Sequence, residues 1–166
     1  MSAQPNRTKS EPKSAMNTLR SILLVEDNPN DVELTLTALK EANLANDVVV
    51  ANDGEQALDY LFRRGRHAGR TGRQPAVILL DLKMPKVDGH EVLRQIRADP
   101  ELRLTPTVIL TSSREERDLF ESYDKGANSY VVKPVDFEEF VTAISKLGIF
   151  WALLNEPPPD EAAAQR

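Results

Sequence analysis

The sequence has 166 residues, of which 40% are hydrophobic and 28% charged, a composition typical of one globular domain with a substantial core. It lacks both the roughly 18 consecutive apolar residues that a membrane span needs and the apolar stretch of a secretion signal, so we expect a cytoplasmic protein. The absence of cysteine excludes disulfides, thiolate metal sites and cysteine nucleophiles, and the formal net charge of −5 argues against general nucleic-acid binding.

Short apolar runs mark the predicted strands. Residues 1–19 are polar and rich in Ser, Pro and Lys, so we expect a disordered tail, followed by the folded domain over 20–154 and a flexible tail over 155–166. The predicted strands are 21–25, 48–50, 76–80, 107–110 and 130–132. Their continuous rather than alternating apolar character favours parallel strands covered by helices on both faces.

A helix-start pattern follows each of these runs. Asn28 precedes Pro29, a cap followed by a proline at the first helical position. Acidic or hydroxyl residues open the other four helices in segments 53–56, 88–91, 113–116 and 136–139. The order is therefore (βα)₅, which predicts an α/β fold with a doubly wound five-stranded parallel sheet.

Two segments interrupt this alternation. Loop 63–73 contains five arginines and three glycines but no acid. We expect a solvated, mobile insertion, with a docking surface for an acidic partner as the alternative. Near the C-terminus, an apolar cluster contains Leu147, Ile149, Phe150, Trp151, Leu153 and Leu154. We interpret the cluster as a homodimer interface, with packing inside the domain as the alternative.

Reactive side chains follow the predicted strands, at the edge where doubly wound sheets bind ligands. Glu26 and Asp27 come after the first strand, and Asp81 after the third. Thr111 follows the fourth strand and Lys133 the fifth. Any one of these acids alone would more often be a helix cap or solvated surface. Together the five positions indicate a functional site.

Three carboxylates grouped in this way require a counter-charge. Two like charges about 4 Å apart repel by a few kcal/mol at an effective dielectric constant near 20. A hard divalent cation removes that cost, and an all-oxygen ligand set favours Mg²⁺. These parts suit phosphoryl transfer, with Asp81 as nucleophile, Lys133 holding phosphoryl oxygens and Thr111 donating a hydrogen bond.

Four segments resemble the signature blocks of response-regulator receiver domains, in the expected order and spacing: LLVEDNPND, ILLDLKMPKVDG, VILTSS and GANSYVVKPVD. The resemblance covers residues 20–150. It implies a flavodoxin-like fold with strand order 2-1-3-4-5 and phosphorylation of Asp81 by a sensor histidine kinase. The length of loop 63–73 and the Phe150-Trp151 pair also resemble single-domain regulators paired with phytochrome-type kinases.

Further roles follow from the resemblance. Asp27, Asp81 and the backbone carbonyl of Lys83 would bind Mg²⁺ directly, with Glu26 acting through water. Lys133 would pair with the phosphoryl group. Thr111 and Tyr130 match the switch pair, in which the hydroxyl moves toward the phosphate and the aromatic ring turns inward.

Other functions fit the sequence less well. A haloacid-dehalogenase-type phosphohydrolase would carry a second Asp where Lys83 stands. A flavodoxin-like redox module or a nucleotide hydrolase would need a glycine-rich phosphate loop, which the chain lacks. A scaffold that has lost phosphorylation remains an alternative, although all the reactive positions are present.

Signal output is expected to occur through protein contacts. About a dozen residues follow the last predicted helix, too few for a DNA-binding or enzymatic effector. We therefore expect a phosphoacceptor switch, which catalyses its own modification by the donor, rather than an enzyme. We expect a homodimer through the face from the fourth helix to the fifth and the C-terminal cluster, whose affinity or geometry changes on phosphorylation.

Overall fold

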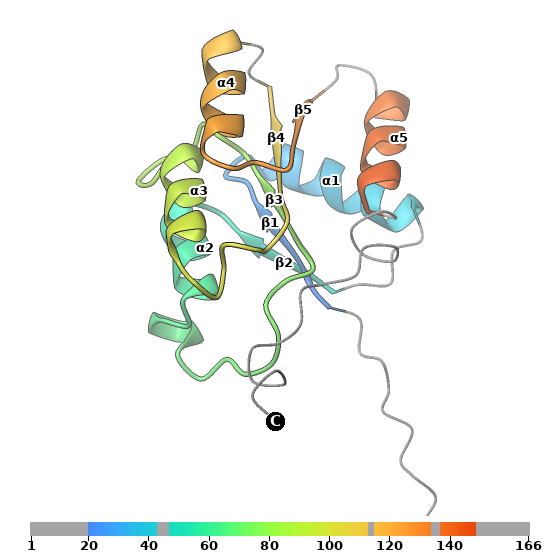
Figure 1. Ribbon diagram of the computed structural model, residues 1–166. Coiled ribbons are helices and arrows are strands. Elements are labelled where there is room, and N and C mark those ends of the chain that lie inside the picture. The colour runs from blue at the N-terminus through green and yellow to red at the C-terminus, as the bar shows by residue number, and fades with distance from the viewer. Residues whose placement is uncertain (1–19, 43–46, 113–114, 134–136, 149–166) are drawn as a thin grey trace, which may run out of the picture.

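The computed structural model describes residues 20–42, 47–112, 115–133 and 137–148. The described elements are β1 (Ile22–Val25), α1 (Pro29–Glu41), β2 (Val48–Ala51), α2 (Gly54–Leu61), η1 (Gly65–His67), β3 (Val77–Leu80), α3 (Gly89–Ala98), β4 (Thr107–Thr111), α4 (Glu116–Asp124), β5 (Ser129–Val132) and α5 (Phe137–Gly148). The strands form one parallel sheet in the order β2-β1-β3-β4-β5 (Figure 1), which confirms the predicted fold class. None of the described helices has the length and apolar character that a membrane crossing requires.

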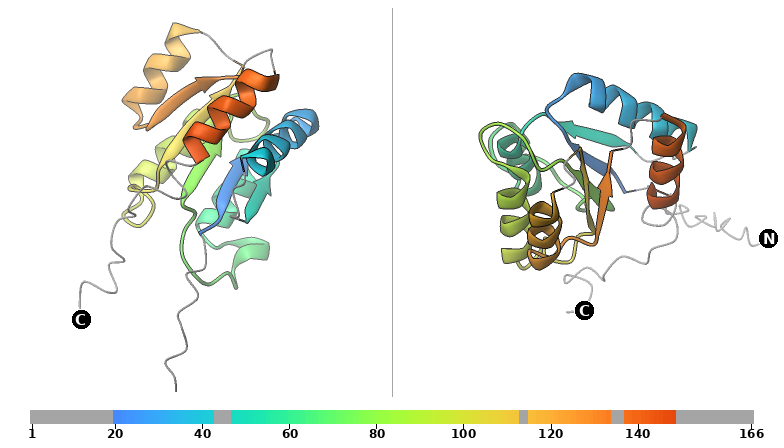
Figure 2. Two further views of the ribbon diagram at one scale, coloured as in Figure 1. Left: turned by 90° about the vertical axis from the view of Figure 1, so that its right-hand side faces the viewer. Right: turned by 90° about the horizontal axis from the view of Figure 1, so that it is seen from above.

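Helices cover both faces of this sheet (Figure 2). On one face α1 lies beside α5, and α2, α3 and α4 lie on the other. Successive strand residues point to opposite faces, so Leu24 packs with Leu39 of α1 whereas Leu23 packs with Leu61 and Ile96 of α2 and α3. Burial of each such side chain contributes about 1.5–3 kcal/mol. This burial on both faces explains why the strands are continuous apolar runs. Each predicted strand begins and ends within one residue of the observed strand.

Helix capping follows the predicted pattern at three of the helix starts. The side chain of Asn28 accepts from the amides of Asn30 and Asp31, at 2.9 and 3.3 Å. Asp53 and Asp88 cap α2 and α3 in the same way, each accepting from the amide three residues later. These bonds satisfy amides that a helix start would otherwise leave without partners.

The predicted start of the fourth helix is wrong. We expected a capping pattern over 113–116, but α4 begins at Glu116 and its cap position is Glu115, which makes no side-chain capping bond. The backbone of Glu115 is still extended (φ −66°, ψ 128°), so helical geometry begins only after it. Position 113 and the predicted cap at position 136 lie outside the described residues, as do both predicted tails and the side chains of the C-terminal apolar cluster.

Two glycines allow the β3–α3 loop to pack against its neighbours. A Cβ atom on Gly54, at the start of α2, would lie 2.0 Å from the carbonyl oxygen of Val87. One on Gly89, at the start of α3, would lie 2.2 Å from the carbonyl oxygen of Asp81. Only glycine fits such approaches without a backbone shift. The loop after Asp81 is therefore enclosed by the first turns of two helices.

Candidate functional site

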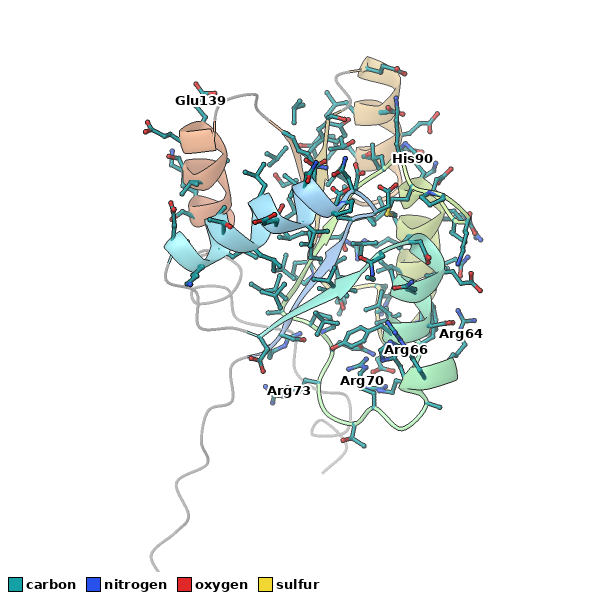
Figure 3. All side chains as sticks on the ribbon, turned by 180° about the vertical axis from the view of Figure 1, so that it is seen from behind. Arg64, Arg66, Arg70, Arg73, His90 and Glu139 are labelled. Atoms are coloured by element: carbon teal, nitrogen blue, oxygen red, sulfur yellow. The ribbon has the colours of Figure 1, made fainter. Side chains whose placement is uncertain are left out.

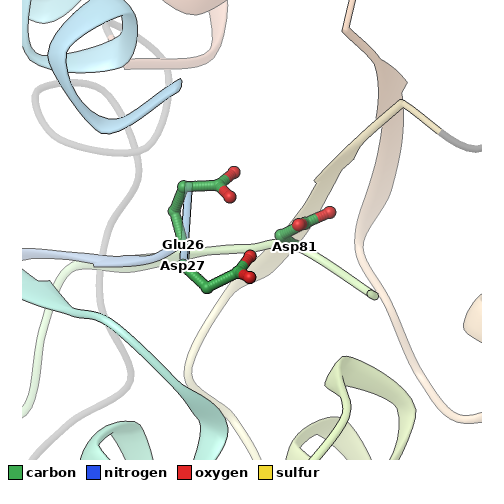
Figure 4. A group of neighbouring side chains, drawn as sticks. All are labelled: Glu26, Asp27 and Asp81. Carbon is green, nitrogen blue, oxygen red and sulfur yellow. The ribbon is translucent and has the colours of Figure 1, made fainter. Parts of the chain in front are cut away.

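Three carboxylates lie at the carboxyl ends of β1 and β3 (Figure 4). Glu26 and Asp27 follow β1 and Asp81 follows β3, and each contributes an oxygen to a group in which all lie within 4.8 Å of one another. Glu26 is 2% exposed and Asp81 7%, whereas Asp27 is exposed to solvent. The amide of Asp81 donates to the carbonyl of Val25 at 3.0 Å, so pairing of the two strands sets the spacing. The sheet brings together the acids that the sequence places at its edge.

Lys133 supplies a positive charge to this group. Its backbone amide donates to the carbonyl of Thr111 at 2.7 Å, which fixes the residue at the end of β5 beside β4. Its Nζ forms a short contact with the Glu26 carboxylate and lies 2.9 Å from Oδ2 of Asp31. The Lys133 side chain is 9% exposed. The amine is therefore held between two carboxylates.

Asp31 is a member of the site that we did not predict from the sequence. It belongs to the first turn of α1, where an acidic residue usually stabilises the helix dipole. Its pairing with Lys133 joins residues 102 positions apart in the chain. The sequence feature that could have indicated its role is its position four residues after Asp27, in the first turn of the helix that follows Glu26 and Asp27.

Burial governs the protonation of Glu26. It raises the pKa of Glu26 to about 7, against the opposing effects of the contact with Lys133 and the 3.0 Å hydrogen bond from the amide of Asn28. The neighbouring Asp81 raises this pKa further. Glu26 therefore changes charge near neutral pH in the metal-free protein.

Asp81 and Lys133 are influenced by the same surroundings. Burial raises the pKa of Asp81, although the charge of Lys133, a hydrogen bond from the Thr111 side chain and one from the amide of Leu82 (2.9 Å) act in the opposite direction. Burial by itself lowers the pKa of Lys133, but its contacts with Glu26, Asp81 and Asp31 raise it overall. Lys133 thus stays charged at neutral pH.

The predicted switch pair lies on adjacent strands. Thr111 ends β4 and is fully buried. Tyr130 of β5 is half-buried, and its ring packs against the core cluster on the α2–α3 face of the sheet. The register pairs Tyr130 with Ile109, two residues before Thr111. Both residues lie in the strands that lead to the acidic group.

The loop after β3 carries two lysines with different surroundings. The Lys83 side chain is 64% exposed, with Nζ 3.6 Å from a carboxylate oxygen of Glu115. Lys86 has a left-handed backbone (φ 63°), and its Nζ lies 3.2 Å from Asp53 and 3.4 Å from Glu55. The ion pair with the buried Asp53 ties the loop to α2, a link that we did not predict from the sequence.

The donor set of this site fits a hard divalent cation. Carboxylate oxygens are the ligands that Mg²⁺ and Mn²⁺ prefer. Around Lys133, the acids Glu26, Asp27, Asp31 and Asp81 outnumber the single amine. A divalent cation would balance this excess and would favour the ionised forms of the carboxyls.

Comparisons with known proteins agree with this architecture. Residues 22–145 match the family model described as the response regulator receiver domain. The solved structure of the bacteriophytochrome response regulator AtBRR is 62% identical, covers 83% of this chain and 99% of that chain, and has a TM-score of 0.69. The phosphorylated cyanobacterial phytochrome response regulator RcpA is 37% identical over 85% of this chain and 99% of that chain, with a TM-score of 0.79.

A third relative is the response regulator Rcp1 of Synechocystis sp. strain PCC 6803. It is 35% identical over 130 residues, which span 78% of this chain and 87% of Rcp1. Its solved Mn²⁺-bound form covers 84% of this chain and 99% of that chain, with 33% identity and a TM-score of 0.77.

Proposed function

Because this chain belongs to the response regulator receiver family, whose members are phosphoacceptor switches rather than conventional enzymes, we propose that Asp81 accepts a phosphoryl group from a sensor histidine kinase. The observation that carries the proposal is the buried carboxylate of Asp81, placed beside Glu26 and Asp27 at the carboxyl edge of the sheet. In the transfer, an Asp81 oxygen forms a bond to phosphorus as the bond between phosphorus and the kinase imidazole nitrogen breaks. The imidazole leaves with the electron pair of the broken bond.

Mg²⁺ would be held by the acidic group. We assign Asp27, Asp81 and the backbone carbonyl of Lys83 as direct ligands and Glu26 as a ligand through water. When bound, the ion neutralises charge on the transferring phosphoryl oxygens. That the solved structure of the relative Rcp1 is a Mn²⁺-bound form supports the binding of a divalent cation by this chain.

The protein's own side chains position and neutralise the new group. Lys133 leaves its contacts with Glu26 and Asp31 and pairs with a phosphoryl oxygen. The hydroxyl of Thr111, which donates to Asp81 before transfer, donates to the phosphoryl group afterwards. Tyr130 responds to this movement at the surface of the β4–β5 edge, and together Thr111 and Tyr130 form the switch pair.

The signal would leave through a homodimer face that extends from α4 to α5. On α4, Leu119 and Tyr123 lie one turn apart and are 39% and 52% exposed. This exposure of large apolar side chains supports an interface there. The C-terminal apolar cluster that begins at Leu147 would extend it. Phosphorylation adds a charge of roughly −1.5 to −2 and would change dimer affinity or geometry through the switch pair.

We propose that the partner is a phytochrome-type sensor histidine kinase and that the two proteins meet in the cytoplasm. We further propose that this chain binds neither membranes nor nucleic acids. Support comes from the relatives, because AtBRR is named a bacteriophytochrome response regulator and RcpA a cyanobacterial phytochrome response regulator. We assign the folded domain to residues 20–154, with tails on either side.

Mass spectrometry of the intact protein tests the phosphoacceptor directly. The protein is incubated with Mg²⁺ and acetyl phosphate beside Asp81→Asn and the matched control Asp124→Asn, an exposed acid at the end of α4. We expect one phosphoryl group on the wild type and the control, none on Asp81→Asn, and none when a chelator removes the metal. Equal phosphorylation of Asp81→Asn would exclude Asp81 as the acceptor. Lack of both phosphorylation and beryllofluoride binding would favour the scaffold alternative.

A further inference from the structure

Loop 63–73 is built into the domain by two of its own arginines. The guanidinium of Arg70 stacks 4.2 Å from the centre of the Tyr60 ring, and its Nε donates to the Tyr60 carbonyl at 3.1 Å. The same side chain donates to the carbonyl of Arg73 and, at 2.7 Å, to Oε1 of Gln74. The rings of His67 and Tyr60 form a T-shaped contact, with their centres 5.2 Å apart. The loop, which is largely exposed to solvent as expected, is therefore anchored on α2 by side-chain contacts.

The second inward arginine ties the loop to the segment after α3. Arg63 donates to the carbonyl of Gly72 at 3.0 Å and forms a 3.1 Å ion pair with Glu101. Glu101 also accepts from the buried Gln74 at 3.2 Å, and Gln74 donates to the carbonyl of Leu61 at 3.0 Å. Arg63, Arg70, Gln74 and Glu101 form one network, which holds both ends of the loop.

The remaining three arginines face solvent. Arg64 is 55% exposed and has a 3.4 Å contact with Asp59, and Arg66 and Arg73 are exposed as well. Figure 3 places Arg64, Arg66, Arg70 and Arg73 at one end of the molecule. His90, next to the glycine that touches Asp81, lies toward the other end. The basic surface formed by Arg64, Arg66 and Arg73 is thus at the opposite pole from the phosphorylation site.

The charge distribution selects the kind of partner. The chain has a formal net charge of −5 and the loop contributes +5, so the rest of the chain carries −10. A long polyanion such as a nucleic acid would meet repulsion from this acidic remainder once it extended past the loop. A short acidic segment would meet only the arginines, whose planar guanidinium groups bind carboxylates through paired hydrogen bonds.

The geometry points to loop 63–73 as a docking surface for an acidic segment of a partner protein, bound by Arg64, Arg66 and Arg73. The network around Arg63 and Arg70 orders the loop backbone before binding, which lowers the entropy cost of association. Because loop 63–73 precedes the start of β3 at Val77, whereas Asp81 follows the end of that strand at Leu80, docking leaves the phosphorylation site open. Binding is therefore independent of phosphorylation.

Fluorescence anisotropy with a defined probe tests this surface. The probe is a fluorescein-labelled peptide of alternating glutamate and serine, measured at about 0.15 M salt, where surface charges are screened beyond roughly 8 Å. The loop variant is Arg64→Gln/Arg66→Gln/Arg73→Gln, which keeps both anchoring arginines. The matched control is Lys40→Gln/Arg103→Gln/Lys146→Gln, which removes three exposed cations elsewhere. Thermal unfolding of each variant shows that it is folded.

We expect the wild type to bind the glutamate peptide and not its glutamine counterpart. Each exposed ion pair contributes a factor of roughly 1.5 to 5, so the loop variant binds about tenfold more weakly. The control variant and the beryllofluoride-bound protein bind like the wild type. The proposal is overturned by an absence of binding, by an equal loss in the control variant, by sensitivity to beryllofluoride, or by tighter binding of a single-stranded oligonucleotide of equal charge. Because the readout does not involve Asp81, its result is separate from that of the phosphorylation test.

Discussion

Replacement of Asp31 by asparagine tests how Lys133 is held before phosphorylation. The Lys133 amine is shared between Glu26 and Asp31, and under the proposed function it must leave both in order to pair with a phosphoryl oxygen. Asp31 therefore stabilises the unphosphorylated state and competes with the phosphoryl group. Asp31→Asn keeps the size of the side chain but removes its charge.

The size of the effect follows from the geometry. Unit charges 2.9 Å apart, the distance between Lys133 Nζ and Asp31 Oδ2, attract by about 6 kcal/mol at an effective dielectric constant of 20, before any desolvation cost. Asp31 is 33% exposed, and Glu26 remains as a partner for the amine. Solvent screening and this second partner reduce the net contribution to about 1 kcal/mol. One kcal/mol corresponds to about a fivefold change in affinity.

Calorimetric titration with beryllofluoride at saturating Mg²⁺ measures this effect. We expect Asp31→Asn to bind the phosphoryl analogue about fivefold more tightly than the wild type. Glu33→Gln, an equal change of charge at an exposed position on the same helix, is the control and should bind like the wild type. Unchanged or weaker binding by Asp31→Asn, or an equal gain in Glu33→Gln, would refute competition for Lys133.

Two further predictions concern the backbone around Asp81 and the protonation of Glu26. Gly89→Ala should lower the free energy of unfolding by about 1 to 3 kcal/mol, because its Cβ would lie 2.2 Å from the Asp81 carbonyl oxygen; Gly69→Ala, with no neighbour within 4 Å, is the control in urea denaturation. A small effect at Gly89 would show that the backbone can move aside. With the metal removed by a chelator, the free energy of unfolding should fall by up to about 3 kcal/mol as the pH rises from about 4.5 to about 7. The reason is that Glu26 loses its proton near pH 4.5 in the unfolded state, whereas in the folded state its pKa is about 7. Glu26→Gln should remove this pH dependence, and its persistence would assign the titration to another group.

The sequence predicts the parts of this molecule that depend on strand order. Continuous apolar runs locate all five strands to within one residue, because β1, β3 and β4 are buried on both faces and the edge strands β2 and β5 are largely half-buried. The same runs predict that Glu26, Asp27 and Asp81 meet at one edge, since parallel strands end together. The predicted caps at Asn28, Asp53 and Asp88 form because each needs only bonds to amides two or three residues away.

Features that depend on distant side chains were not predictable in this way. Asp31 has the same local signature as an ordinary first-turn acid, and only the end of β5 brings Lys133 to it. Loop 63–73 has the composition of a solvated segment, yet Tyr60 and Glu101 anchor two of its arginines. The start of α4 was also not predictable in this way, because the backbone of Glu115 is extended and helical geometry begins only at Glu116.

The contact of Gly54 with Val87 has a consequence for cooperative unfolding. Since the carbonyl of Val87 occupies the space of a missing Cβ atom, and Lys86 is ion-paired with Asp53, the loop beside Asp81 and the first turn of α2 cannot separate without breaking both contacts. The loop thereby joins the local folding unit of the helix rather than opening on its own. Amide hydrogen exchange in this loop should share the opening free energy of α2, so the loop beside the proposed phosphorylation site should open less often than an ordinary surface loop.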